Sequence, residues 1–460
     1  MLEAMSLSRL QDALSARLIG DDAAFSAVST DSRAIEPGQL FVALVGPRFD
    51  GHDYLAEVAS KGAVAALVSR EMENPPLPLL LVSDTRLALG KLGALNRAAF
   101  HGSVAAVTGS SGKTTAKEMI ASILRVAQGD IAGVLATRGN LNNDLGVPLT
   151  LLALGAEHRS AVIELGASGV GEIAYTVSLV RPQISLITNA GTAHVGEFGG
   201  PEKIVEAKGE ILDGLAEDGT AVLNLDDRAF AIWRQRAGKR RVLGFALENQ
   251  QADFHATSIT RDERGCPGFT LCSPAGSAAV QLNLLGRHNI ANALAAAAVA
   301  HALGVGLGTI VSGLQSMQPV KGRTVASIGF NNVRLIDDSY NANPVAMCAA
   351  VDILAGFCAG RTLLVLGDMG ELGQWAEEGH REVGSYASGK VNALWAIGPL
   401  MSHAVAAFGN GGRHFGDQAS LIEALRQECK ANTTILIKGS RSAAMDKVVA
   451  ALSEATMEKH

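Results

Sequence analysis

The segment GSSGKT (109–114) carries the side chains best suited to chemistry in this sequence. Its two glycines let backbone N–H groups curl around phosphate oxygens, while Lys113 adds positive charge and the Thr114 hydroxyl suits Mg²⁺. An ordinary Gly/Ser turn with a surface lysine is the alternative, but the segment stands between an apolar run and a helical pattern, as phosphate-binding loops do. We therefore predict a phosphate site formed by Gly109, Ser110, Ser111, Gly112, Lys113, Thr114 and Thr115.

Further polar side chains follow the next two apolar runs. Glu164 ends one of them, at the position where ligands gather in open α/β sheets. Alone, it would be read as a helix cap or a solvated side chain. Asn189 and His194 follow the next run, and Lys208 lies in EAKGEIL; a single histidine is more often structural, and a single lysine more often faces solvent. Because Glu164 follows the loop by one sheet connection, we interpret it as an oxygen ligand for a metal.

The elements that must position these residues alternate between short apolar runs and helical patterns. The loop is followed by a helical pattern over 114–126, and the same alternation continues for about a hundred residues. This predicts a doubly wound, mostly parallel sheet. Besides the run at 103–109, its strand candidates are Ala161–Leu165, Ile184–Thr188, Ala221–Leu225 and Val242–Phe245.

Three domains are expected from the pattern as a whole. Residues 1–100 form a smaller α/β unit, 101–318 the central domain, and 319–460 a third, Rossmann-like α/β series. Alternating segments within 252–286 read as antiparallel hairpins on one edge of the central sheet, followed by a helix that stops near Gly304. Strands of the third domain are predicted at Val333–Ile336, Thr362–Leu366, Ala393–Ile397 and Thr434–Ile437.

Composition narrows the class of protein. With 48% hydrophobic and 18% charged residues among 460, the chain is compact and not disordered. A net charge of -6 gives no global attraction for nucleic acid or an anionic membrane. Five cysteines without a CxxC pair suit a reducing cytoplasm, and neither a signal peptide nor a membrane span is expected.

Taken in order, the motifs resemble those of the Mur ligase family. They are the shortened GSSGKT loop, the glutamate after the next strand, TNAGTAHVGEFG (188–199) and AKGEI (207–211), and the resemblance covers essentially the whole chain. It implies ATP as a substrate and two Mg²⁺ ions, with Thr114 and Glu164 holding one ion and His194 helping to hold the second. It also implies that Lys208 is carbamylated by CO₂, which turns a cation into an anionic oxygen ligand for Mg²⁺.

The resemblance assigns further substrate contacts. Asn292, in GRHNIANALAAAA, would bind adenine, although an asparagine lining a packed helix is the alternative on chemistry alone. Arg323 would reach the γ-phosphate, and Asp338 would take the ribose hydroxyls. The catalytic set implied is Lys113, Glu164, His194, Lys208 and Arg323. Contacts to a UDP-linked substrate are expected at Asp31, Ser32, Arg33 and Asn143.

Three segments point to one branch of the family. IDDSYNANP (336–344), VLGDMGELG (365–373) and IKGSR (437–441) resemble the ligases that add D-alanyl-D-alanine to UDP-N-acetylmuramoyl-tripeptide; Asp446 stands where their pattern has glutamate. The activity implied is ATP-dependent amide formation by a cytoplasmic monomer. The competing readings are a folylpolyglutamate synthetase, which lacks a counterpart to the first hundred residues, and a non-catalytic nucleotide-binding protein or regulatory ATPase.

Overall fold

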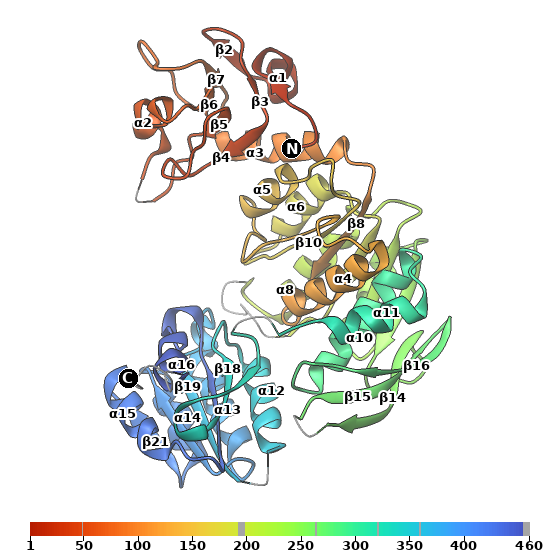
Figure 1. The fold of residues 1–460 in the computed structure, drawn as a ribbon, viewed down its shortest axis with the longest axis vertical. Helices are drawn as coiled ribbons and strands as arrows, with labels where there is room; N and C mark the ends of the chain where they lie inside the picture. The colour runs from red at the N-terminus through yellow and green to blue at the C-terminus, as the bar shows by residue number, and fades with distance from the viewer. Residues whose placement is uncertain (48, 192–197, 263–264, 320–321, 358–359, 454–460) are drawn as a thin grey trace, which may run out of the picture.

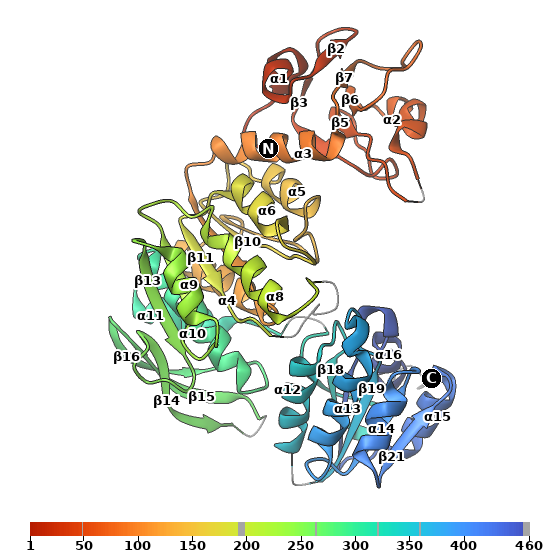
Figure 2. The same cartoon turned by 180° about the vertical axis from the view of Figure 1, so that it is seen from behind.

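The structure, a computed structural model, describes the chain except for residues 48, 192–197, 263–264, 320–321, 358–359 and 454–460. Figures 1 and 2 show three α/β domains in a row, with the N-terminal domain at one end and the C-terminal domain at the other. Among the described residues, no helix has both the length and the apolar character needed to cross a membrane. The predicted three-domain α/β fold is confirmed.

The N-terminal domain is built on a five-stranded sheet of order β2-β7-β6-β5-β4, beside a two-stranded ladder of β1 and β3. Apolar clusters cover both faces of this sheet, which is why its inner strands are unbroken apolar runs. The elements are β1 (Met5–Ser6), α1 (Leu7–Leu14), β2 (Arg17–Ile19), β3 (Ala24–Phe25), β4 (Ala27–Ser29), β5 (Gln39–Val42), η1 (Gly51–Tyr54), α2 (Leu55–Ser60), β6 (Ala65–Val68), β7 (Leu79–Leu81) and α3 (Thr85–Ala98).

The central domain holds a nine-stranded sheet of order β16-β15-β14-β13-β12-β11-β8-β10-β9. Its strands are parallel except at the β14-β15-β16 edge, so the antiparallel edge predicted from residues 252–286 is confirmed. The strands are β8 (Ser103–Thr108), β9 (Val134–Ala136), β10 (Ser160–Glu164), β11 (Ile184–Ile187), β12 (Thr220–Asn224), β13 (Arg241–Ala246), β14 (Phe254–Arg261), β15 (Pro267–Ser273) and β16 (Gly276–Gln281).

Strand order in the central sheet explains where the candidate residues meet. After β8 the chain builds β9 and β10 on one side, and then crosses to build β11 on the other side of β8. The carboxyl ends of β8, β10 and β11 therefore lie next to one another, at the switch point where open α/β sheets bind ligands. The helices are α4 (Lys113–Gln128), α5 (Gly146–Leu152), α6 (Glu172–Val180), α8 (Pro201–Gly209), η2 (Glu210–Leu212), α9 (Phe230–Ala237), α10 (His288–Ala302) and α11 (Leu307–Ser316).

The C-terminal domain has a six-stranded sheet of order β17-β18-β22-β19-β20-β21, parallel except for β17. Its elements are β17 (Val325–Ile328), η3 (Phe330–Asn332), β18 (Arg334–Asp338), α12 (Pro344–Ala355), β19 (Arg361–Gly367), η4 (Gly373–Trp375), α13 (Ala376–Ala387), β20 (Ala393–Ile397), α14 (Met401–Phe408), β21 (Gly412–Phe415), α15 (Gln418–Glu428), β22 (Thr433–Lys438), η5 (Arg441–Ala443) and α16 (Asp446–Ser453).

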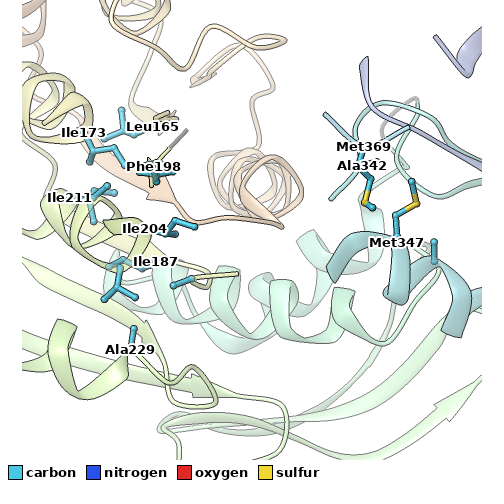
Figure 3. Packing of buried hydrophobic residues seen from close by; sticks show 14 of the residues in the cluster. Leu165, Ile173, Ile187, Phe198, Ile204, Ile211, Ala229, Ala342, Met347 and Met369 are labelled. Atoms are coloured by element: carbon cyan, nitrogen blue, oxygen red, sulfur yellow. The ribbon is translucent and has the colours of Figure 1, made fainter. Parts of the chain in front are cut away.

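Buried apolar side chains fix the helices that carry the site. In the central domain, Leu165, Ile173 and Phe198 lie together where β10, α6 and the start of α8 meet (Figure 3). On the other side of the view, Met347 and Met369 lie near each other within the C-terminal domain. Each of these side chains is less than 8% exposed, so the backbone segments that lead to the cavity are held by packed cores.

Candidate active site

A cavity of about 1210 Å³ lies between the central and C-terminal domains. The central domain lines it with the loop after β8 and the carboxyl end of β10, and the C-terminal domain with the ends of β18 and β22. The cavity brings together the following residues predicted from the sequence: Ser110, Ser111, Gly112, Lys113, Thr114, Thr115, Asn143, Glu164, Asn292, Arg323 and Asp338.

The phosphate-binding loop is braced from the neighbouring strand. The Asn189 side chain, just after β11, accepts from Ser111 N–H at 3.0 Å, and the Asn189 carbonyl accepts from Ser110 N–H at 3.0 Å. Gly112 has φ of +77°, and a Cβ there would stand 2.4 Å from Asn292 Oδ1. A glycine is therefore required both for the turn and for the close approach to α10. The loop then leads into α4, whose N-terminus at Lys113 favours anions.

Lys113 is turned back onto its own loop. Its Nζ donates to the Gly109 carbonyl at 2.7 Å and to that of Ser110 at 3.4 Å. Burial in the cleft lowers the pKa of Lys113; the negative charge of Glu164 opposes this shift, and the positive charge of Arg323 adds to it. A phosphate oxygen at this position would supply the negative charge that favours the ammonium form.

Glu164 is buried, and both of its carboxylate oxygens accept hydrogen bonds. Thr114 Oγ1 donates to Oε2 at 2.8 Å, and Asn142 Nδ2 donates to Oε1 at 2.9 Å. The Glu164 N–H donates to Thr137 Oγ1 at 2.9 Å, which fixes the backbone beneath the carboxylate. A hydroxyl and a carboxylate that converge beside the phosphate loop form an oxygen donor set that fits Mg²⁺. His194, the other predicted ligand, lies outside the described residues.

Lys208, near the end of α8, is buried with its Nζ 5.1 Å from the ring centroid of Phe198. Desolvation lowers the pKa of Lys208 to about 7, and the positive charge of Lys113 adds to the shift. The carboxylates of Glu172 and Glu210 oppose it. A substantial fraction of this amine is therefore neutral near pH 7, the form in which an amine reacts with CO₂.

The C-terminal side of the cavity is held by ion pairing. Lys438, at the end of β22, lies 2.7 Å from Asp338, which ends the neighbouring strand β18, and both side chains are largely buried. Thr324 Oγ1 also donates to Asp338, at 3.2 Å. The guanidinium of Arg323 stacks 4.4 Å from the ring centroid of Tyr340. Asp338 and Arg323 therefore face the same space, each with a partner from its own domain.

The remaining predicted contacts divide between two places. Asn292 is buried in the cavity wall, where its Nδ2 donates to Asn289 Oδ1 at 2.9 Å. Asn143 Oδ1 accepts from the Gly146 N–H at 2.8 Å, at the start of α5. By contrast, Asp31, Ser32 and Arg33 lie in the N-terminal domain, outside the cavity lining, where Arg33 pairs with Asp31 at 2.7 Å.

Several residues that hold the site were not predicted. Asn142 and Thr137 bind Glu164, Lys438 binds Asp338, and Tyr340 holds Arg323. The sequence carries a weak indication of one: Lys438 ends the apolar run TTILI, where a lysine is unexpected unless it has a buried partner. The others act through bonds that depend on backbone position.

The fold and the cavity define a three-domain α/β protein in which a phosphate-binding loop faces a second domain. Family models match three successive parts of the chain: the Mur ligase family catalytic domain over 24–97, the Mur ligase middle domain over 107–300, and the Mur ligase glutamate ligase domain over 322–441. The chain belongs to the Mur ligase family.

Individual relatives match along nearly the full length. The chain is 46% identical over 453 residues to the UDP-N-acetylmuramoyl-tripeptide–D-alanyl-D-alanine ligase of Escherichia coli K12, covering 98% of each chain. A crystal structure of MurF from Acinetobacter baumannii has a TM-score of 0.92 at 39% identity and covers 98% of this chain and 99% of that one. MurF ligase from Thermotoga maritima in complex with ADP has a TM-score of 0.84 at 28% identity, covering 93% and 97%.

Proposed function

We propose that this chain uses ATP to join D-alanyl-D-alanine to the terminal carboxylate of UDP-N-acetylmuramoyl-tripeptide. The observation that carries the proposal is the cavity between two domains, which places Lys113 and Glu164 opposite Arg323 and Asp338. Full-length similarity to ligases of this description supports the choice of substrates. At about 1210 Å³ the cavity exceeds an ordinary small-ligand pocket of roughly 300–1,000 Å³, as two substrates meeting in one site require.

The first chemical step suits the phosphate side of the cavity. The tripeptide carboxylate attacks the γ-phosphorus of ATP, the bond from that phosphorus to the bridging oxygen breaks, and ADP leaves with the electron pair. Lys113 and Arg323 are placed to face the charge that spreads over the phosphoryl oxygens. The product of this step is an acyl phosphate.

The second step forms the amide. The amino group of D-alanyl-D-alanine attacks the acyl carbon, a proton leaves the nitrogen, and inorganic phosphate departs with the electrons of the broken C–O bond. No side-chain nucleophile is required. Catalysis by this chain consists of holding two substrates in line, neutralising charge and excluding water from the acyl phosphate.

Mg²⁺ fits the donors beside the loop. We propose that Thr114 and Glu164 hold one ion, and that His194 and Lys208 contribute to a second. When bound, Mg²⁺ would neutralise phosphate charge. The carbamate that we propose on Lys208 is supported by the enclosed position of this amine, because an ammonium there would repel a cation and a carbamate would bind it.

The N-terminal domain is the proposed binding site for the UDP end of the substrate, through Asp31, Ser32 and Arg33, and Asn143 is the proposed contact within the cavity lining. We propose domain boundaries of 1–100, 101–318 and 319–460.

Asn292 and Asp338 are proposed to bind the adenine and the ribose of ATP. We also propose a monomer that works in the cytoplasm, where ATP is available.

Mass spectrometry of the reaction mixture tests the proposed function. Incubation of the protein with UDP-N-acetylmuramoyl-tripeptide, D-alanyl-D-alanine, ATP and Mg²⁺ should give the ligated pentapeptide product, ADP and phosphate in equal amounts. Omission of either peptide substrate should abolish product. Formation of ADP at the same rate without the peptides, with no ligated product in the complete mixture, would instead identify a regulatory ATPase.

A further inference from the structure

Lys117 is a buried lysine that none of the proposed substrate contacts uses. It lies on α4, one turn after Lys113, and its side chain is only 1% exposed. A buried ammonium is unfavourable unless it is paired, and an apolar side chain at this helix position would pack without that difficulty. The charge therefore calls for a specific explanation.

The partners of Lys117 lead directly to the proposed metal carboxylate. Its Nζ donates to the carbonyl oxygen of Thr137 and lies 2.8 Å from Glu118 Oε1, which balances its charge. The hydroxyl of the same Thr137 accepts from the Glu164 N–H at 2.9 Å. Glu164 then accepts from Thr114 Oγ1 at 2.8 Å, so three consecutive hydrogen bonds join the lysine to both proposed ligands.

The place of Thr137 in the sheet explains why a cation is needed. Thr137 follows β9, a three-residue strand at the edge of the central sheet that, among the described strands, pairs with β10 alone. The Thr137 N–H donates to the Val162 carbonyl of β10 at 3.1 Å, and the other side of this short edge strand has no neighbouring strand among the described residues. A charge-assisted hydrogen bond from α4 fixes the Thr137 peptide relative to the helix that begins at the phosphate loop. Thr114 and Lys117 are thereby tied to Glu164 from two sides.

We propose that Lys117 is a positioning residue, which sets the Glu164 carboxylate for Mg²⁺ by holding Thr137 in place. This inference rests on the proposed function only in taking Thr114 and Glu164 as a Mg²⁺ site. Lys117 itself contacts neither metal nor nucleotide. Its loss weakens the coupling between Mg²⁺ and the nucleotide and leaves binding of the metal-free nucleotide in place.

Calorimetry with ADP measures this coupling as a ratio, the dissociation constant in EDTA divided by the dissociation constant in excess Mg²⁺. In Lys117→Met the ratio should fall by about 10-fold or more relative to wild type, as for loss of a group that orients a metal ligand. The dissociation constant in EDTA should stay within about 2-fold, given that metal-free ADP does not use Glu164. A folded Lys117→Met protein with an unchanged ratio, or a wild-type protein without any Mg²⁺ effect, overturns the proposal.

Thr137→Val provides a second test if Lys117→Met does not fold. It removes the hydroxyl that accepts from Glu164 N–H and keeps the carbonyl that Lys117 binds. The matched control is Thr150→Val, since Thr150 is also buried but its hydroxyl donates to Gly146 O within α5. Thr137→Val should lower the ratio and Thr150→Val should not. Equal effects in both variants would show that loss of any buried hydroxyl weakens the coupling by destabilising the fold, and would overturn the proposal.

The proposed ligase activity does not enter these measurements. A wild-type protein that makes no amide product but shows the coupling, lost in Lys117→Met, would refute the ligase proposal and leave this inference standing. A wild-type protein that makes the product, with unchanged coupling in both variants, would refute the inference alone.

Discussion

The Lys113 ammonium donates hydrogen bonds to carbonyls of its own loop in this structure. The same N–H groups are the donors that phosphate oxygens would need. The carbonyls of Gly109 and Ser110 hold the ammonium near the N-terminus of α4, which is where an anion is favoured. Binding of a polyphosphate therefore requires a short displacement of a charge that is already beside the site. Burial in the cleft lowers the pKa of Lys113, because it disfavours the charged form of the amine.

Replacement of Lys113 by alanine is expected to abolish product formation without unfolding the protein. The side chain contacts loop carbonyls and not a packed core, so its loss removes charge stabilisation in the phosphoryl-transfer step, and the rate should fall about 10³-fold. Single-turnover kinetics and circular dichroism measure the two effects. Lys239→Ala, at an exposed lysine, is the control. Near-normal turnover by folded Lys113→Ala would show that the Lys113 charge is not needed for phosphoryl transfer.

Lys208→Ala should also be folded and nearly inactive, because the proposed carbamate would be lost. Formate at millimolar concentration should restore part of the activity by placing a carboxylate in the space that the side chain occupied. Lys203→Ala is the matched control, since Lys203 lies on the same helix but is exposed and pairs with Glu206. The measurement is the steady-state rate of product formation by each variant, with and without formate. Full activity of Lys208→Ala without added acid would contradict the proposed role.

At the scale of elements, α3 joins two domains. It begins in the N-terminal domain and packs along α5 and α6 of the central domain, as both views show. Gly93 permits this approach, because a Cβ there would stand 2.9 Å from Pro148 Cα. Asn96 Nδ2 then donates to the carbonyls of Leu151 and Leu154 at the end of α5, at 2.8 and 3.0 Å. Arg97, next along α3, donates to Val180 and Arg181 at the end of α6.

Asn96→Ala should therefore destabilise the junction of these two domains. The substitution removes a donor from two buried carbonyls, of which that of Leu151 still accepts from the Leu154 N–H at 3.2 Å. Since one buried unsatisfied carbonyl costs roughly 1–3 kcal/mol, a loss in that range is expected. Urea unfolding measures the change. Asn410→Ala, at an exposed turn, should leave the midpoint unchanged. An equal urea midpoint for Asn96→Ala and wild type would show that the Asn96 hydrogen bonds do not stabilise the packing of α3 against α5.

The inner strands could be predicted from sequence because burial on both faces leaves long apolar runs. Ile184–Thr188 is predicted where β11 spans Ile184–Ile187, and the prediction of Ala393–Ile397 coincides with β20. In the central and C-terminal domains, three strands are missed: β9, β17 and β21. All three lie at sheet edges and have three or four residues. The side chains of β17 and β21 are largely exposed, and β9, although buried, is too short to give a clear apolar run.

Some site residues can be predicted from the sequence around them, and others depend on contacts between distant parts of the chain. Lys113 belongs to a contiguous loop motif, and Glu164 ends an apolar run, so both positions can be read from neighbouring residues. Thr137 and Asn142 lie more than 20 residues before the glutamate that they hold. Their role depends on β9 and β10 being adjacent, which strand order decides and local sequence does not.

At the scale of the whole molecule, two sheets present their carboxyl ends to one cavity. The central domain contributes Lys113, the C-terminal domain contributes Arg323, and the charge of Arg323 helps to lower the pKa of Lys113. Like charges that face each other from separate domains favour an open arrangement. A bound polyphosphate reverses the sign of this interaction, because each cation is then attracted to the anion between them. Nucleotide binding should consequently draw the two domains together.

Small-angle X-ray scattering of the full chain tests this closure. The radius of gyration of wild-type protein should decrease on saturation with Mg²⁺ and a non-hydrolysable ATP analogue, and the decrease should shrink as salt is raised, since salt screens the attraction. Arg323→Ala should still bind the analogue through the central domain, yet show a smaller decrease, because its C-terminal domain has lost one of the cations that line the cavity. Lys239→Ala, at an exposed position of the central domain, should match wild type. Calorimetry on the same samples confirms saturation. An unchanged radius of gyration for saturated wild type, or an undiminished decrease in Arg323→Ala, would show that phosphate charge does not drive the closure.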